Sequence, residues 1–108
     1  MKVAVIMGSI SDKDIAKKTC DVLKEFGIEY EAKVISAHRS LDFAVDFVNS
    51  MEEKNIELII AFAGKAAHLA GVLAGISTTP VIGVPVKAST LDGLDALLST
   101  VQMPKGVP

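Results

Sequence analysis

Blocks of apolar residues alternate with polar stretches along this chain, and the pattern predicts four repeats of a strand followed by a helix. Residues 3–7 (VAVIM) form a continuous apolar run, which is typical of a strand buried on both faces of a parallel sheet. After the loop GSISD, a helical pattern begins at Asp12 and stops at Gly27. We expect the apolar stripe of this helix, the face that packs on a core, to contain Ile15, Thr19, Val22, Leu23 and Phe26.

The second repeat has the same order of elements. Residues 30–35 (YEAKVI) predict a strand, SAHRS predicts a loop, and the segment after it predicts a helix that ends near Asn55. One face of that helix is apolar at the spacing i, i+3, i+4 and i+7, through Ala44, Phe47, Val48 and Met51.

The third and fourth repeats complete the pattern. A strand at 57–63 (ELIIAFA) and the loop GKAAH lead into LAGVLAGIS, which is apolar on all sides and therefore predicts a buried helix. A strand at 80–86 (PVIGVPV) and the loop KAST lead into a last helix, LDGLDALLSTVQ. In this loop Ser89 and Thr90 are expected to cap the helix, and Ser89 and Asp92 have the spacing of a capping box.

Four strand-helix units with short loops predict one three-layer, doubly wound α/β domain over residues 1–108, with a parallel sheet between two layers of helices. In such a sheet, the loops that leave the carboxyl ends of the strands meet at one edge. Ligands bind there, at the point where the strand order reverses. The chemistry of this chain is therefore expected in its strand-to-helix loops.

The first loop combines a glycine, two hydroxyls and a carboxylate at the start of a helix. Free backbone N–H groups at such a position favour an anion such as phosphate, and Ser9 or Ser11 can add hydrogen bonds. Helix capping is the commoner role of these residue types, so Ser9, Ser11 and Asp12 also fit a purely structural reading. The loop lacks the GxxxxGK[ST] and GxGxxG patterns, which makes binding of ATP or a dinucleotide less expected.

The second and third loops hold both histidines and the only arginine. The guanidinium of Arg39 suits phosphate or carboxylate, the imidazole of His38 can move protons near neutral pH, and Ser36 lies beside them. The third loop ends at His68, and its Gly64 lets a ligand approach the backbone closely. A surface position for the His38 and Arg39 pair and a structural role for His68 are the alternatives. Because these scarce side chains share one predicted edge, the sequence favours a site.

Composition narrows the classes of function. A net charge of −2, with no basic run and no tryptophan, argues against a general nucleic-acid surface, and no apolar segment is long enough for a signal-peptide core or a membrane span. The single cysteine, Cys20, excludes an intrachain disulfide framework, fits a reducing cytoplasm and is expected to be a buried, inert thiol. Two histidines in separate loops, with no cysteine pair and no HExxH, make tight metal binding unexpected, and a GxSxG nucleophile motif is absent.

The chain resembles the bacterial class of N-carboxyaminoimidazole ribonucleotide mutase, the catalytic subunit of phosphoribosylaminoimidazole carboxylase. The resemblance runs nearly from end to end through five ordered motifs: MGSISD, SAHRS, AGKAAHLAG, GVPV and VQMPKGVP. It implies a flavodoxin-like fold and a cytoplasmic homo-octamer in purine (IMP) biosynthesis, with no membrane or nucleic-acid partner. It also implies an isomerase that moves a carboxylate from the exocyclic nitrogen of a ribonucleotide to a ring carbon, without metal or organic cofactor.

The resemblance assigns roles to the loop residues. It implies that His38 is the general acid and base, donating a proton during decarboxylation and accepting one after the ring carbon attacks the trapped carbon dioxide. Ser9, Asp12 and Arg39 are implied to bind the ribose phosphate part, and His68 to place the base and carboxylate. The full substrate-binding set implied in this way is Ser9, Ser11, Asp12, Ser36, Ala37, Arg39, Gly64, Ala66, His68 and Leu69.

The chain departs from the family pattern in several places. Lys65 stands where the family often has a second glycine, and it can alter the shape or charge of the third loop. Leu41 and Ala70 replace common prolines at helix starts. The family continues beyond the position of Pro108 with a strand and further helices, so we expect a shortened form with a bare sheet edge and exposed apolar surface.

Two other functions stay open on the sequence alone. One is a non-catalytic fragment that binds the ribonucleotide, and the other is a related carboxylase that uses free carbon dioxide. The AAHL sequence, in place of the SNGLGP-like loop of animal-type carboxylases, favours the mutase over the carboxylase.

Overall fold

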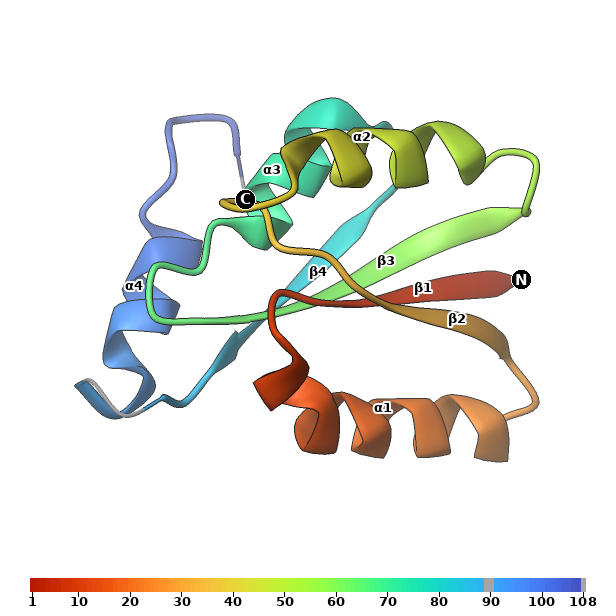
Figure 1. Ribbon diagram of the computed structural model, residues 1–108, viewed down its shortest axis with the longest axis horizontal. Coiled ribbons are helices and arrows are strands. Elements are labelled where there is room, and N and C mark those ends of the chain that lie inside the picture. Colours follow the sequence, from red (N-terminus) through yellow and green to blue (C-terminus); the bar gives the residue numbers. More distant parts are fainter. Residues whose placement is uncertain (89–90, 108) are drawn as a thin grey trace.

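The structure is a computed structural model that describes residues 1–88 and 91–107, and within them it confirms the predicted alternation of strands and helices (Figure 1). Two short 3-10 turns, η1 and η2, precede the first and last helices. The elements are β1 (Lys2–Met7), η1 (Ile10–Asp12), α1 (Lys13–Glu25), β2 (Glu29–Val34), α2 (Leu41–Ser50), β3 (Ile56–Gly64), α3 (Leu69–Ile76), β4 (Val81–Val86), η2 (Leu91–Gly93) and α4 (Leu94–Val101).

In the described residues the four strands form one parallel sheet in the order β2-β1-β3-β4. The chain moves outward from β1 to β2, then returns across β1 to β3 and continues outward to β4. The strand order therefore reverses between β1 and β3, the switch point at which doubly wound sheets bind ligands. This arrangement confirms the predicted flavodoxin-like fold.

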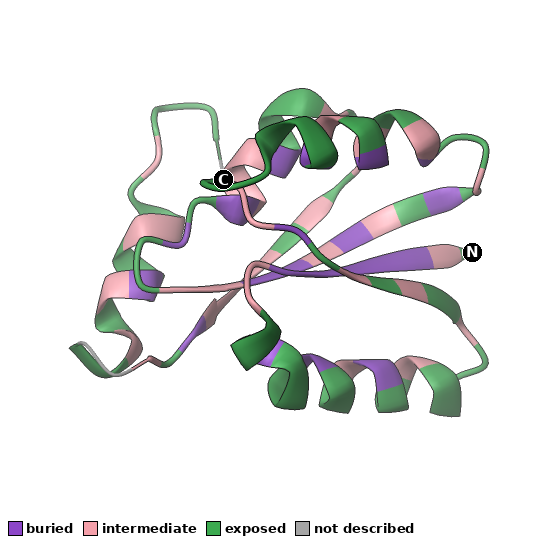
Figure 2. Ribbon diagram, viewed as in Figure 1, coloured by how far each residue is buried: buried purple, intermediate pink, exposed green. Residues whose placement is uncertain are grey.

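The two faces of the sheet bury alternate residues of the same strand. On β1, Val3 and Val5 face the cluster that includes α1, while Ala4 and Ile6 face the cluster beneath α2 and α3. Figure 1 shows α1 alone on one side of the sheet, with α2 and α3 on the other. The buried residues in Figure 2 run along β1 and the sheet-facing sides of these helices. An apolar run without alternation is thus explained by burial on both faces.

The face of α1 that packs on the sheet matches the predicted stripe only in part, because Leu23 packs against the core cluster but three other members of the stripe do not. Ala16 and Cys20 are buried, whereas Ile15, Val22 and Phe26 are exposed, Phe26 by 74%. Small side chains four residues apart allow the helix to pack closely on the bulky residues of β1, and the larger apolar groups are left on the outer side. Burial also raises the pKa of the Cys20 thiol, as expected for an inert cysteine.

The other helices follow the sequence pattern in part. On α2, the predicted face is confirmed, because Ala44, Phe47 and Met51 are buried. The prediction that α3 is buried on all sides was wrong, since Leu69 and Leu73 are buried but Ile76 at its end is exposed. The expected caps at Ser89 and Thr90 lie outside the described residues. The side chain of Asp92 forms an ion pair with Lys87, with 2.9 Å between Nζ and Oδ1.

One edge of the sheet and part of one face are only half covered. β4 has a strand neighbour on one side, and Ile82 in it is 49% exposed within the part of the chain that the structure describes. Leu58, Ile60 and Val84, on the face that carries α1, are packed but not fully buried. Ile82 therefore contributes to an exposed apolar surface at this edge of the sheet. No helix in residues 1–88 and 91–107 has the length and apolar character needed to cross a membrane.

Candidate active site

A cavity of about 430 Å³ opens at the carboxyl ends of β1, β2 and β3, at the switch point of the sheet. Its walls are the loops that follow these strands. Every residue that the sequence singled out for the site lines this cavity: Ser9, Ser11, Asp12, Ser36, Ala37, His38, Arg39, Gly64, Ala66, His68 and Leu69. Gly8, Ala63, Lys65 and Ala88 also line it and were not predicted as site residues. The position of Gly8 and Ala63 near strand ends is a signal that could have identified them.

Hydrogen bonds of the sheet continue into the loops and hold the walls together. The backbone N–H of Gly8 donates to the carbonyl of Phe62 at 2.9 Å, and the N–H of Ile35 donates to the carbonyl of Met7 at 2.8 Å. The three loops therefore start from fixed points. A Cβ at Gly64 would lie 3.2 Å from the carbonyl oxygen of Val86, which is a tight contact, so a larger residue there would require a small shift of β4.

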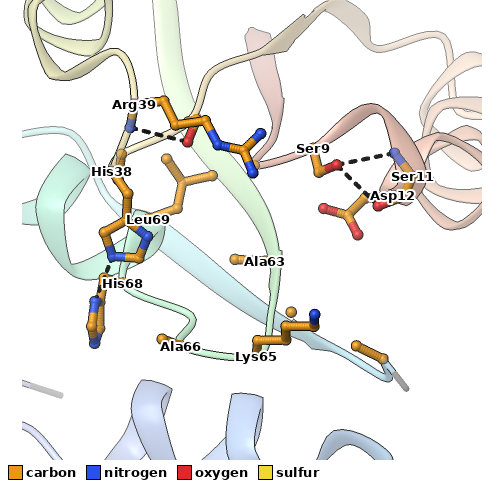
Figure 3. Close-up of a pocket in the computed structure, with 15 residues that line it drawn as sticks. Ser9, Ser11, Asp12, His38, Arg39, Ala63, Lys65, Ala66, His68 and Leu69 are labelled. Carbon is orange, nitrogen blue, oxygen red and sulfur yellow. Dashed lines mark hydrogen bonds between the residues drawn. The ribbon is translucent and has the colours of Figure 1, made fainter. Parts of the chain in front are cut away.

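The first loop presents hydroxyl groups to the cavity (Figure 3). Ser9 caps η1, and its Oγ accepts hydrogen bonds from the Ser11 N–H at 3.3 Å and from the Ser11 Oγ at 3.0 Å. Because Ser9 Oγ is the acceptor in both contacts, its own hydroxyl proton is available to an anionic ligand. Ser9 thus caps the turn and still has a donor for a ligand.

Asp12 is a buried carboxylate on the cavity wall. Only 6% of the residue is exposed, and although it stands at the N-cap position of α1, its side chain makes no capping hydrogen bond. The purely structural reading of Asp12 as a cap is therefore not what the structure shows. Burial raises the pKa of Asp12 above its ordinary value, and a backbone hydrogen bond with Ser9 opposes part of that effect.

Replacing Asp12 with Asn is expected to raise the midpoint of thermal unfolding at pH 7 by a few degrees. A carboxyl whose pKa is raised by folding binds its proton more tightly in the folded state, so it costs stability once the pH is above its folded pKa. The advantage of Asp12→Asn should therefore shrink as the pH falls through that pKa and vanish below the unfolded pKa. Thermal unfolding of both proteins from pH 3 to pH 8 measures this. A variant that unfolds at a lower temperature at pH 7 would contradict the prediction.

The second loop is a tight turn that carries two cavity side chains. The hydroxyl Oγ of Ser36 accepts a hydrogen bond from the Arg39 N–H at 3.3 Å, and the Ser36 carbonyl accepts one from the Ser40 N–H at 2.9 Å. Figure 3 shows His38 and Arg39 extending from this turn at the cavity. Among residues 1–88 and 91–107, no carboxylate lies within 4 Å of the Arg39 guanidinium. Its fork of donors is therefore open to a phosphate or carboxylate.

The two histidines form a hydrogen-bonded pair across two loops. His38 Nε2 lies 2.8 Å from His68 Nδ1, and the rings meet edge to face with centroids 4.9 Å apart. One nitrogen of this contact must carry a proton and the other must accept, so the tautomers of the two rings depend on each other. Nδ1 of His38 has no hydrogen-bond partner in the described part of the chain and is the ring atom open to a ligand.

The third loop is fixed by buried side chains, by a hydrogen bond within the loop and by a contact with α4. Ala67 and Leu69 are buried, and the His68 N–H donates to the Ala66 carbonyl at 2.9 Å. Ser99 Oγ on α4 donates to the Asp95 carbonyl at 2.8 Å and lies 3.5 Å from the Lys65 carbonyl. Lys65 itself has a positive φ of 53°. In the described ranges, no three His, Cys, Asp or Glu side chains come together as a metal ion would require.

The sequence of this chain is similar to those of known proteins from one family. A sequence model described as AIR carboxylase matches residues 2–108. N5-carboxyaminoimidazole ribonucleotide mutase of Thermotoga maritima is 55% identical over 107 residues, which are 99% of this chain and 63% of that protein. The protein of the same name from Saccharolobus solfataricus is 53% identical, over 99% of this chain and 68% of its own length.

A solved structure supports the same relationship. The crystal structure of Treponema denticola PurE matches with a TM-score of 0.90 and 32% identity, and the match covers 99% of this chain and 68% of that one. The chain thus spans between 63% and 68% of the length of these three relatives.

Proposed function

The chain belongs to the AIR carboxylase family, and from this premise we propose that it is the core of a mutase in purine biosynthesis. The proposed reaction converts N-carboxyaminoimidazole ribonucleotide to carboxyaminoimidazole ribonucleotide. The names of relatives that are 53–55% identical support this choice of reaction. The observation that carries it is the His38 and His68 pair in a cavity that also holds open anion-binding groups.

His38 is the proposed general acid and base. It gives a proton to the exocyclic nitrogen as the N–C bond to the carboxylate breaks and carbon dioxide is released. The ring carbon then attacks the retained carbon dioxide, and His38 takes the proton from that carbon to restore the aromatic ring. One proton is given and one is taken, so the reaction is balanced without a cofactor. The contact of Nε2 with His68, which leaves Nδ1 open, supports this role.

The rest of the cavity is the proposed binding surface for the nucleotide. Ser9, Asp12 and Arg39 bind the ribose phosphate part, with the hydroxyl of Ser9 and the guanidinium of Arg39 directed to the anion. The loop from Gly64 to Leu69 covers the base and the carboxylate. The cavity volume of about 430 Å³ supports this reading, because sites for small molecules have volumes of this order.

The protein is proposed to act in the cytoplasm as a homo-oligomer, an octamer as the family resemblance implies. The free, buried Cys20 is consistent with a reducing compartment. Exposed apolar side chains on α1, including Val22 and Phe26, and exposed Ile82 on β4 support contacts with further copies. No membrane or nucleic-acid partner is part of the proposal.

The deciding experiment is turnover of N-carboxyaminoimidazole ribonucleotide by this chain, followed by the ultraviolet change on carboxylate transfer, with no ATP, metal or bicarbonate added. Conversion is expected. A folded chain that binds the nucleotide but does not convert it would be a binding fragment. This outcome is included because the chain spans only 63% and 68% of the length of the two relatives. Product formed only from aminoimidazole ribonucleotide and added bicarbonate would identify a carboxylase instead.

A further inference from the structure

The charges of the cavity include a cation that the proposed mechanism does not use. The titratable side chains that line it are Asp12, His38, Arg39, Lys65 and His68. With neutral histidines, two cations and one carboxylate leave a net charge of +1 here, although the whole chain carries −2. A cavity of opposite sign to the protein favours an anionic ligand with more than one negative group.

We infer that Lys65 is a second oxyanion-binding residue of this cavity, which makes the site specific for a ligand with two separate anionic groups. This inference rests on the proposed function, whose substrate carries both a phosphate and a carboxylate. It adds to that function a residue that determines which nucleotide is bound.

The position of Lys65 is separate from that of Arg39. Arg39 follows β2 and Lys65 follows β3, and Figure 3 shows the two side chains on opposite sides of the cavity. Lys65 is exposed, and no carboxylate lies within 4 Å of its ammonium group among residues 1–88 and 91–107. Two cations so placed can bind two anionic groups of one ligand.

The backbone at Lys65 is a second, independent observation. Its φ of 53° is in the left-handed region, which a glycine adopts without cost and which is unfavourable for a residue with a long side chain. Strain of this kind persists where the surroundings hold it, and it concentrates at functional sites. Here the Ser99 hydroxyl contacts the Lys65 carbonyl, and buried Ala67 anchors the loop two residues later. The loop therefore holds a charged side chain on the cavity wall where an uncharged glycine would fit more easily.

The other charged side chains of the cavity leave a role for the ammonium group of Lys65 in binding a second anionic group. The carboxylate of Asp12 also lines the cavity and offsets one of its positive charges, and the guanidinium of Arg39 can bind only one of two well-separated groups. A lysine supplies a compact positive charge on a flexible stem, which can follow a carboxylate or a phosphate without a fixed fork geometry. The shared chemistry is an oxyanion, and the test below distinguishes its two sources.

The test compares Lys65→Asn with Lys65→Arg. Asparagine tolerates the left-handed conformation and removes the charge, whereas arginine keeps the charge in the same backbone conformation. Lys24→Asn, on an exposed lysine at the far end of α1, controls for the change in net charge. Dissociation constants are measured by calorimetry for aminoimidazole ribonucleotide, carboxyaminoimidazole ribonucleotide and inorganic phosphate.

We expect Lys65→Asn to weaken binding of the carboxylated nucleotide by roughly 10- to 100-fold, with Lys65→Arg and Lys24→Asn close to the wild type. A loss confined to the carboxylated nucleotide identifies the carboxylate as the partner of Lys65. An equal loss for all three ligands would put Lys65 on the phosphate together with Arg39 and would overturn the claim of two separate anionic groups. Unchanged binding by Lys65→Asn would overturn the inference while the mutase proposal stands. A wild-type chain that binds neither nucleotide would overturn both.

Discussion

Replacing His38 with Asn is expected to lower kcat for carboxylate transfer by roughly 10²- to 10⁴-fold, the usual contribution of a positioned general acid and base. Asparagine keeps an amide at the position of Nδ1, the ring atom open to a ligand, but it cannot exchange a proton near neutral pH and does not reach the Nε2 position that contacts His68. The fold should be preserved, because His38 is an exposed residue of a loop and no buried cluster includes it. Single-turnover ultraviolet assays and calorimetric titration with the product nucleotide separate the loss of chemistry from any loss of binding.

His68→Ala is the matched control for this experiment. It removes the other member of the pair while the proposed acid and base stays in place. We expect a smaller loss of kcat, with a changed pH dependence, because the partner that fixes the tautomer of His38 is gone. Turnover by His38→Asn at the wild-type rate would remove His38 from the mechanism, whereas equal losses in both variants would indicate that the pair acts as one unit.

The location of the site could be predicted from the sequence because it depends on topology. Continuous apolar runs at 3–7 and 58–63 indicate parallel strands, and parallel strands bring the loops after them to one edge. No knowledge of side-chain packing is needed for that step. This is why residues as far apart as Ser9 and His68 could be assigned to one cavity before the structure was considered.

The features that were not predicted depend on packing and on backbone detail. Of the stripe of large apolar residues on α1, only Leu23 packs against the core, and the fully buried residues of this helix are the smaller Ala16 and Cys20. Helical periodicity alone cannot predict which of these residues is buried, because it gives no information on the distance between the helix and the sheet. The contact of His38 with His68 spans 30 positions and depends on how two loops are held. The left-handed conformation of Lys65 is not indicated by the residue type, since lysine does not favour it, and only the glycine that the resemblance implies at this position points to it.

The position of the cavity depends on the backbone of the strand ends, whereas its chemistry depends on the side chains of the loops. Backbone hydrogen bonds between neighbouring strand ends, such as Gly8 to Phe62, are made by any residue and hold the loops in place. The loops are then free to vary in the side chains they present. A loop residue such as Lys65 can therefore alter ligand specificity without any change in the sheet beneath it.

Arg39→Met is expected to raise KM for the nucleotide by about 10- to 100-fold with a much smaller change in kcat. Hydrogen bonds to a charged group are worth enough to give this loss, and a phosphate remote from the reacting atoms is bound equally in the ground and transition states. Methionine keeps much of the length of the side chain but has no donor. Steady-state kinetics at low salt measure both constants, and Arg39→Lys should recover part of the affinity through its point charge.

The double variant Arg39→Met/Lys65→Asn tests whether the two cations bind separate anionic groups of the nucleotide. If the two cations bind separate anionic groups of one nucleotide, each variant removes its own contact, and the free-energy losses in binding should add within the usual limits for independent sites. If both bind the same phosphate, the second substitution should cost far less than it does alone. Unchanged KM in Arg39→Met would show that the guanidinium has no substrate contact, and the anion would then have to be bound by Lys65 and the hydroxyls of the first loop.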